Sequence, residues 1–248
     1  MKKFFSLLAG LMAFCSVSFA QGFNNFGEGV SELTHFPISE SEKFEFSGLS
    51  YIGVGFHAPF NPVSNDFLQH TSFFKNVEFY FNLAEVQFHP YDGGSVSLGV
   101  DLDWDYFNLE RDSFWMPDDI THTQVSVLPA VSEMKTVKKS RLSVMSFNFP
   151  LSFEHQIGSW SFRAGVTAEI NLHGIVRTKG IDAKNDSKTI EYYSNHILTR
   201  VFTHSYMVAA SYGGLGLYVR YNPSSPFRYG CGPDFSSVTF GLVFGFGM

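Results

Sequence analysis

Cysteine is scarce in this chain, which has two in 248 residues, Cys15 and Cys231. Cys15 lies in an N-terminal segment that we expect to be removed, so Cys231 remains alone. A single cysteine cannot form a disulfide bond within the chain. The stability of the fold must therefore come from burial and strand pairing.

Long apolar runs and positive charge are also lacking. After the N-terminus, no stretch reaches the roughly 18 consecutive apolar residues of a membrane-spanning helix. Without Lys2 and Lys3, the chain has 15 basic against 23 acidic residues, a formal charge of −8. This balance argues against nucleic acid as a partner.

The N-terminus has the form of a secretory signal peptide. Two lysines follow Met1, an apolar segment runs from Phe4 to Phe14, and Ala20 ends a small-residue cleavage site. We therefore expect residues 1–20 to be cleaved after export. Residues 21–44 are irregular in pattern, and we expect them to form a periplasmic lead-in or a plug in the lumen of the domain that follows.

The most informative pattern is a strict alternation over residues 95–106. The even positions are apolar or aromatic: Val96, Leu98, Val100, Leu102, Trp104 and Tyr106. The odd positions are small or acidic: Ser95, Ser97, Gly99, Asp101, Asp103 and Asp105. A period of two is that of a β-strand. Behind an export signal, it predicts a transmembrane β-barrel with the apolar face toward lipid and the polar face toward the lumen.

Similar segments recur to the C-terminus. We expect eight strands, at about 45–57, 74–88, 95–109, 141–155, 160–173, a sixth ending at Tyr212, 215–221 and 237–248. Long polar loops at 111–139, 179–195 and 223–233 alternate with short turns at 89–94, 156–159 and 213–214. This order predicts an all-β, antiparallel, up-and-down barrel over residues 45–248, with short periplasmic turns and both termini on the periplasmic side. About eight strands leave a lumen that side chains can fill.

Two irregularities interrupt the pattern. The alternation slips after Leu83, which indicates either a β-bulge or the point where the strand leaves the membrane. Pro150 stands inside an alternating strand and cannot donate a ladder hydrogen bond, so we expect a bulge or a gap in pairing there.

Two segments carry a resemblance to known proteins. Residues 147–154, with Pro150, followed by a short turn and the strand 160–172, resemble the PorT-like group of outer-membrane β-barrels; this group implies the barrel fold but no active site. The last strand resembles the sorting strand that barrel-insertion machinery recognises, and we expect its alternate residues to face lipid: Phe240, Leu242, Phe244 and Phe246.

The inward faces carry the charges. We expect a polar network across the lumen, because buried charges need partners; its members are Asp101, Asp103, Asp105, Arg163, Glu169 and Arg220. The nine histidines are dispersed and no ligand motif is present, so no metal or cofactor site and no catalytic site is predicted.

These features predict a small barrel in the outer membrane of a Gram-negative-type cell. Its role would be structural, in surface interaction, or accessory to transport or secretion, and it would not be a wide porin. The expected partners are outer-membrane lipid, the barrel-insertion machinery and other envelope proteins. One alternative is a lipid-modifying enzyme built from His173, Glu169 and Ser205. The other is a soluble periplasmic barrel with its apolar face inside, around an apolar ligand.

Overall fold

The computed structural model describes residues 44–60, 71, 73–130, 134–183 and 188–245. The expected signal peptide (1–20), all of the lead-in except Phe44, and Phe246 lie outside the described residues. Within the described part of the chain, no helix has the length and apolar character needed to cross a membrane.

Strands make up nearly all of the described structure, together with the short 3-10 helix η1 (Phe73–Lys75). The strands are β1 (Phe44–Ser47), β2 (Tyr51–Phe60), β3 (Val77–Tyr91), β4 (Gly94–Asn108), β5 (Ser113–Pro117), β6 (Val125–Pro129), β7 (Met134–Ile157), β8 (Trp160–Asp182), β9 (Thr189–Ser194), β10 (Phe202–Tyr212), β11 (Leu215–Asn222) and β12 (Ser236–Gly245).

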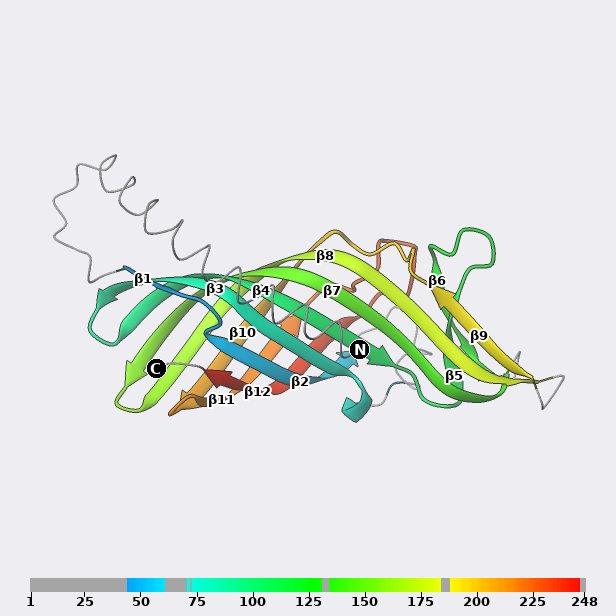
Figure 1. Ribbon diagram of the computed structural model, residues 1–248, viewed down its shortest axis with the longest axis horizontal. Coiled ribbons are helices and arrows are strands. Elements are labelled where there is room, and N and C mark those ends of the chain that lie inside the picture. The colour runs from blue at the N-terminus through cyan, green and yellow to red at the C-terminus, as the bar shows by residue number, and fades with distance from the viewer. Residues whose placement is uncertain (1–43, 61–70, 72, 131–133, 184–187, 246–248) are drawn as a thin grey trace.

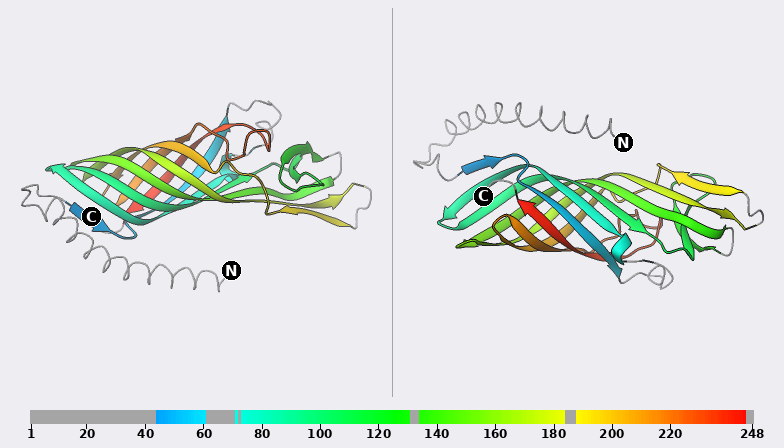
Figure 2. Two further views of the ribbon diagram at one scale, coloured as in Figure 1. Left: turned by 90° about the horizontal axis from the view of Figure 1, so that it is seen from above. Right: turned by 60° about the horizontal axis from the view of Figure 1, so that its bottom comes forward.

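Eight of these strands close into a ring. The hydrogen-bonded order β3-β2-β12-β11-β10-β8-β7-β4 returns to its start through the pairing of β3 with β4, and every pair is antiparallel. Figures 1 and 2 show the strands inclined to the long axis of the barrel. Closure satisfies the backbone groups that an open sheet would leave at its edges. The predicted fold class is confirmed.

The predicted alternation of short and long connections is also present. Short turns join β3 to β4, β7 to β8, and β10 to β11 at one end of the barrel, which is the left end in Figure 1. Glycines with positive φ make these turns: Gly93 (80°), Gly158 (61°), Gly213 (56°) and Gly214 (85°). The longer connections lie at the opposite end.

Two long loops expected from the sequence contain strands instead. The segment 111–139 holds the β5–β6 hairpin and the start of β7, and the segment 179–195 holds the end of β8 and all of β9. β7 and β8 continue beyond the end of β4, and β9 pairs with this continuation of β8. We call the described parts of residues 134–140, 177–182 and β9 the outer arm; Figure 1 shows it extending from the right end of the barrel.

The first expected strand, 45–57, is also interrupted. β1 ends at Ser47, Leu49 has a positive φ of 56°, and β2 begins at Tyr51. β1 pairs with residues 85–88 of β3, near the short turn to β4, rather than continuing β2, so that β3 has three neighbours along its length.

Both predicted irregularities are found. The register of β3 and β4 shifts between Asn82 and Ala84, which is the bulge expected after Leu83. The β4–β7 ladder runs to Leu98↔Leu151 and resumes at Asp101↔Asn148, which leaves a gap beside Pro150. The other side of β7 stays paired through Pro150↔Thr167, because proline keeps its carbonyl acceptor.

A further bulge was not predicted. Between β7 and β8 the register shifts at Met145 and Ser146, which pair with His173 and Asn171. Directly paired residues share a face of the sheet. His173 therefore shares the outward face with Met145, whereas an unbroken alternation along residues 160–173 would put it inward with Asn171.

Candidate functional site: a polar lumen closed at its outer end

The middle of the lumen is organised around Arg220, on β11. Its Nη1 atom lies 2.8 Å from Glu78 Oε1 and 2.5 Å from Asp103 Oδ2. The guanidinium group also lies over the ring of Tyr80, 4.7 Å from the centroid. All of these side chains are buried. Asn148 Nδ2 donates a further hydrogen bond to Asp103 Oδ2 at 2.9 Å, so the cluster links β3, β4, β7 and β11 across the lumen.

His57 forms a neighbouring cluster from β2. Its Nε2 atom lies 2.8 Å from Asp105 Oδ1, and its Nδ1 atom lies 2.8 Å from Thr239 Oγ1 and 3.9 Å from Glu78 Oε2. The ligand atoms of His57, Glu78 and Asp105 lie within 4.8 Å of one another, so these three groups could hold a metal ion. No sequence pattern indicates this group, because its members come from three strands, β2, β3 and β4. Arg220 contacts Glu78 Oε1 and Thr239 contacts His57 Nδ1, whereas Glu78 Oε2 has no hydrogen-bond partner among the described residues.

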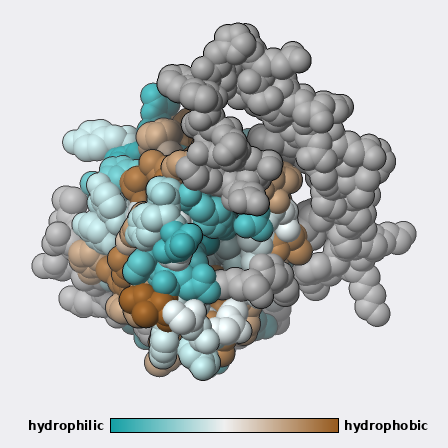
Figure 3. Space-filling view, turned by 90° about the vertical axis from the view of Figure 1, so that its left-hand side faces the viewer, coloured by the Kyte–Doolittle hydropathy of each residue, from teal (hydrophilic) through white to brown (hydrophobic). Residues whose placement is uncertain are grey.

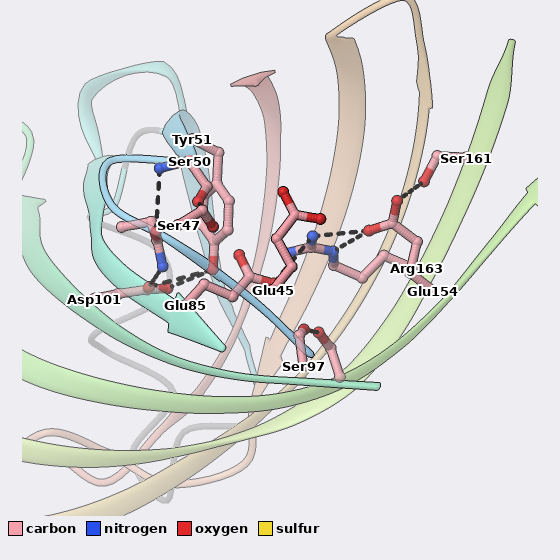
Figure 4. Close-up of polar contacts among 12 residues, drawn as sticks. Glu45, Ser47, Ser50, Tyr51, Glu85, Ser97, Asp101, Glu154, Ser161 and Arg163 are labelled. Carbon is pink, nitrogen blue, oxygen red and sulfur yellow. Dashed lines mark hydrogen bonds and ion pairs between the residues drawn. The ribbon is translucent and has the colours of Figure 1, made fainter. Parts of the chain in front are cut away.

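A third cluster lies nearer the short turns. Arg163, on β8, contacts Glu154 (Nη2 to Oε2, 2.7 Å) and Glu85 (Nη2 to Oε1, 3.3 Å). Figure 4 shows Ser161 and Arg163 both donating to Glu154. On the other side of the same region, the Tyr51 hydroxyl lies 3.2 Å from both oxygens of Asp101.

This third cluster borders a cavity of about 420 Å³ that is open at the short-turn end. Its lining includes Ser47, Tyr51, Tyr80, Glu154, Arg163 and Met207. Figure 3 looks at this end and shows hydrophilic side chains gathered near the middle of the face. The cavity is a polar vestibule, with hydroxyl, carboxylate and guanidinium groups that can bind water or a small polar molecule.

An apolar plug closes the end of the lumen opposite the short turns, which we call the outer end. Along the inward face of β4 the acidic residues give way to Phe107, and Leu109 follows the strand; both are buried. They pack with Trp115 of the β5–β6 hairpin and with residues of the β11–β12 connection, and the cluster consists of Phe107, Leu109, Trp115, Val125, Leu142, Val144, Val176, Ile197, Phe227 and Phe235.

Hydrogen bonds fix the hairpin inside this end. The Trp115 indole N–H donates to the Phe107 carbonyl (3.2 Å), its backbone N–H donates to Ser140 Oγ (2.8 Å), and its carbonyl accepts from Thr178 Oγ1 (2.7 Å). The loops are also tied to one another, since Val125 N–H donates to the Cys231 carbonyl (2.8 Å). The β5–β6 hairpin and the β11–β12 connection, which the structure describes, therefore fold inward as one packed element.

The outer wall of the barrel is apolar. On β4, Leu98 is 57% exposed while Asp101 is 2% exposed. Of the residues expected to face lipid, Val96, Leu98, Phe240, Leu242 and Phe244 are exposed, and Val100 and Leu102 are half-buried on the same face. Aromatic side chains adjoin them toward the outer end, where Trp104 packs edge-on against Phe81 and Tyr106 against Phe79.

The expected lumen residues do lie inside, but their partners differ in part from the expected network. Arg220 meets Asp103, whereas Arg163 bonds to Glu154 and Glu85 rather than to the three aspartates of β4. Asp101 accepts from Asn82 Nδ2 (2.8 Å), Asp105 pairs with His57, and Glu169 accepts from Thr203 Oγ1 (2.8 Å). The phase slip in β3 was the available signal for Glu85, because a bulge there turns this residue inward.

The structure brings together only two of the three residues proposed for a lipid-modifying site. Glu169 and Ser205 are buried side by side in the lumen, but His173 lies on the opposite face of β8. The structure therefore does not form the arrangement of nucleophile, base and acid that this alternative requires.

No protein-family model and no curated protein sequence matches the chain. Among solved structures, Ail, the attachment invasion locus protein of Yersinia pestis, in complex with the heparin analogue sucrose octasulfate, is similar with 10% identity and a TM-score of 0.31, over 81% of this chain and 99% of that one. LpxR from Salmonella typhimurium is similar with 10% identity and a TM-score of 0.26, over 82% of this chain and 87% of that one. The Ralstonia pickettii toluene transporter TbuX is similar with 8% identity and a TM-score of 0.19, over 81% of this chain and 90% of that one.

Proposed function

We propose that this chain is a small outer-membrane β-barrel that does not conduct solutes and that anchors the outer arm at the cell surface. The observation that carries the proposal is the combination of an apolar outer wall with a lumen crossed by ion pairs and closed by the Trp115 plug. An apolar wall around a polar interior is the arrangement that lipid requires, and it is the reverse of a soluble barrel that holds an apolar ligand.

The outer arm supports a role in surface interaction. Met134 and Val137 of the arm are buried in a hydrophobic cluster together with Phe114 of β5 and Ala130, which follows β6. Hydrophobic packing of this kind gives the arm a fixed shape before it binds a partner. A loop without a core would lose more conformational entropy on binding, because it would become ordered only at that step. A rigid projection beyond the lipid is suited to contact with other molecules of the envelope or the cell exterior.

Two further roles stay as alternatives within this proposal. The vestibule at the short-turn end would face the periplasm, where it could serve a transport or secretion partner, in keeping with the PorT-like pattern around Pro150. The barrel-insertion machinery is the expected partner of β12 during assembly.

Fractionation and surface proteolysis test the proposal. The chain should remain in the outer membrane after carbonate washing. Protease added to intact cells should cut in the outer arm or the β11–β12 connection and spare the turns at Gly93 and Gly213, since the long connections lie outside. Release by carbonate would overturn the membrane assignment. Cutting at the short turns with the outer arm protected would reverse the topology.

A further inference from the structure

Four basic side chains form a cluster where the outer arm joins the barrel. In the β7–β8 ladder Lys139 is paired directly with Lys179, and Arg141 directly with Arg177. Directly opposite residues have Cβ atoms about 5 Å apart on one face of the sheet. Lys139, Arg141, Arg177 and Lys179 thus form a compact group, which we call the basic cluster, in a chain whose overall charge is negative.

Such an arrangement is unfavourable without a counter-charge, because like charges directly opposite in a sheet repel. Glu191, on β9, compensates part of it, with its carboxylate 2.7 Å from Arg177 Nε and 3.1 Å from Lys179 Nζ. Among the described residues, no ion pair reaches Lys139 or Arg141. The repulsion is visible at Lys139, whose pKa is lowered by Arg141 and, less strongly, by its partial burial and by Arg177.

The basic cluster lies on the outward face of the sheet, directly beyond the apolar wall on the side of the outer arm. Arg141 pairs with Asn108 at the end of β4, and its guanidinium group lies over the Tyr106 ring, 4.7 Å from the centroid. On the same face of β7, Ser143 and then Met145 follow Arg141 toward the short-turn end, and Met145 lies opposite Trp104 of β4. The bulge at Met145 and His173 keeps Arg177 on this outward face of β8.

This position is where the headgroups of the surrounding lipid would lie. The aromatic residues Trp104 and Tyr106 occupy the place of the interfacial girdle of a membrane barrel. Guanidinium and ammonium groups just beyond that girdle bind phosphate oxygens through charge-assisted hydrogen bonds.

We propose that the basic cluster binds the phosphate groups of an outer-leaflet lipid, with Lys139 and Arg141 making the contacts that no protein carboxylate makes. The bound phosphate supplies the missing counter-charge and fixes the base of the outer arm against the membrane. The proposal rests on the outer-membrane position of the barrel.

The test uses the full chain folded into vesicles of phosphatidylcholine alone, with lipid A carrying its phosphates, or with dephosphorylated lipid A; inorganic phosphate in the buffer is a fourth arm. The test variant is Lys139→Gln/Arg141→Gln. The control is Lys188→Gln/Arg228→Gln, which removes two exposed cations from the outer loops. The unfolding temperature is measured for each.

Phosphorylated lipid A should raise the unfolding temperature of the parent and the control, and the test variant should lose about half of this rise or more, since two of four cations are gone. In phosphatidylcholine alone the test variant should be at least as stable as the parent, because repulsion is relieved. Added salt should weaken the lipid effect.

Equal responses of the parent and the test variant would overturn the proposal, as would an equal effect of dephosphorylated lipid A. A full effect of inorganic phosphate alone would assign the cluster to free phosphate and not to lipid. A chain that fails to insert into any vesicle would contradict the membrane position itself, which is a separate result from insertion without a phosphate effect.

Discussion

Single glycines determine how much of the lumen the tyrosines can fill. A Cβ atom at Gly53 would lie 1.9 Å from Cε1 of Tyr80, and one at Gly241 would lie 2.3 Å from Cε1 of Tyr218. These rings in turn lie beside Arg220 and contribute to the barrier across the lumen. Glycine on the inward face is therefore required by packing, because any side chain there must displace a buried ring.

Gly53→Ala should destabilise the barrel by about 1–3 kcal/mol, since the added Cβ over-packs the lumen at Tyr80. Gly48→Ala is the matched control, because its nearest neighbour is the Leu83 carbonyl oxygen at 3.7 Å, an ordinary contact. Urea unfolding in detergent micelles or vesicles measures both. If the two variants unfold at the same urea concentration, the lumen has more free space than the structure describes.

Asp118 orders the turn between β5 and β6. Its carboxylate accepts hydrogen bonds from Thr121 Oγ1 (2.7 Å) and from the backbone N–H groups of Thr121 (2.8 Å), Thr123 (2.8 Å) and Gln124 (2.9 Å). These bonds, with the Thr121 hydroxyl contributing most, hold the pKa of Asp118 below its ordinary value. A lowered folded-state pKa means that the stabilisation is present above the ordinary pKa of about 3.9 and is lost as the pH falls through the folded-state value.

Asp118→Asn should therefore speed amide hydrogen exchange at Thr123 and Gln124 at neutral pH. The difference from the parent, after correction for intrinsic exchange rates, should shrink as the pH falls below about 4, where the carboxylate of the locally opened state, but not yet that of the closed state, begins to protonate. Asp119→Asn, at the exposed neighbouring position, should leave exchange unchanged. A difference between Asp118→Asn and the parent that does not depend on pH would contradict the role of the charge.

At the level of elements, the period-two pattern was enough to predict eight strands, their faces and the order of the connections. It was enough because each strand has one polar and one apolar environment, so that a residue in an unbroken ladder reports its side. His173 is an exception, because the bulge beside it reverses the alternation. The bulge after Leu83 and the pairing gap at Pro150 could also be predicted, since each breaks the pattern or removes a donor. Strand ends could not be predicted where β7 and β8 leave the barrel, because Lys135, Lys138 and Lys139 look like a polar loop.

The partners across the lumen and the plug could not be predicted either. Alternation shows that Glu78 and Arg220 point inward, but their heights in the barrel depend on the stagger of non-adjacent strands. In the β5–β6 hairpin, Phe114 and Trp115 stand among polar residues with Pro117 close by, a composition that is typical of surface loops. Its inward position depends on tertiary packing against Phe107 and Phe227, which no local pattern encodes.

The apolar face of β4 makes a direct prediction for this element. Val100→Arg should cost about 2–4 kcal/mol if the residue lies near the bilayer midplane. Spin labels at Leu98, Val100 and Leu102 should be accessible to a lipid-soluble quencher, and labels at Asp101 and Asp103 should not. Quenching of the inward labels instead would mean that the apolar face of the barrel does not meet lipid.

In the whole molecule, the lumen has two unlike ends. The short-turn end is a polar vestibule of about 420 Å³, the middle is crossed by the Arg220 and His57 clusters, and the outer end is an apolar plug. An ion entering from the vestibule would meet the buried charge network and then a dry hydrophobic cluster. Both are barriers to permeation, since desolvating a charge is costly and the Ser140 and Thr178 hydroxyls at the plug are already hydrogen-bonded to Trp115.

The intact chain should therefore give no large, stable conductance steps in a planar bilayer. Trp115→Ala should destabilise the plug by about 3–5 kcal/mol, because a fully buried ring is removed and its cavity stays partly unfilled. Transient openings should then become more frequent. Trp160→Ala is the control, since this ring is 50% exposed on the outer wall at the opposite end. Porin-sized openings from the unaltered protein would show that the lumen is a channel. A Trp115→Ala protein that is folded and destabilised but shows no conductance openings would show that the polar clusters close the barrel without the plug.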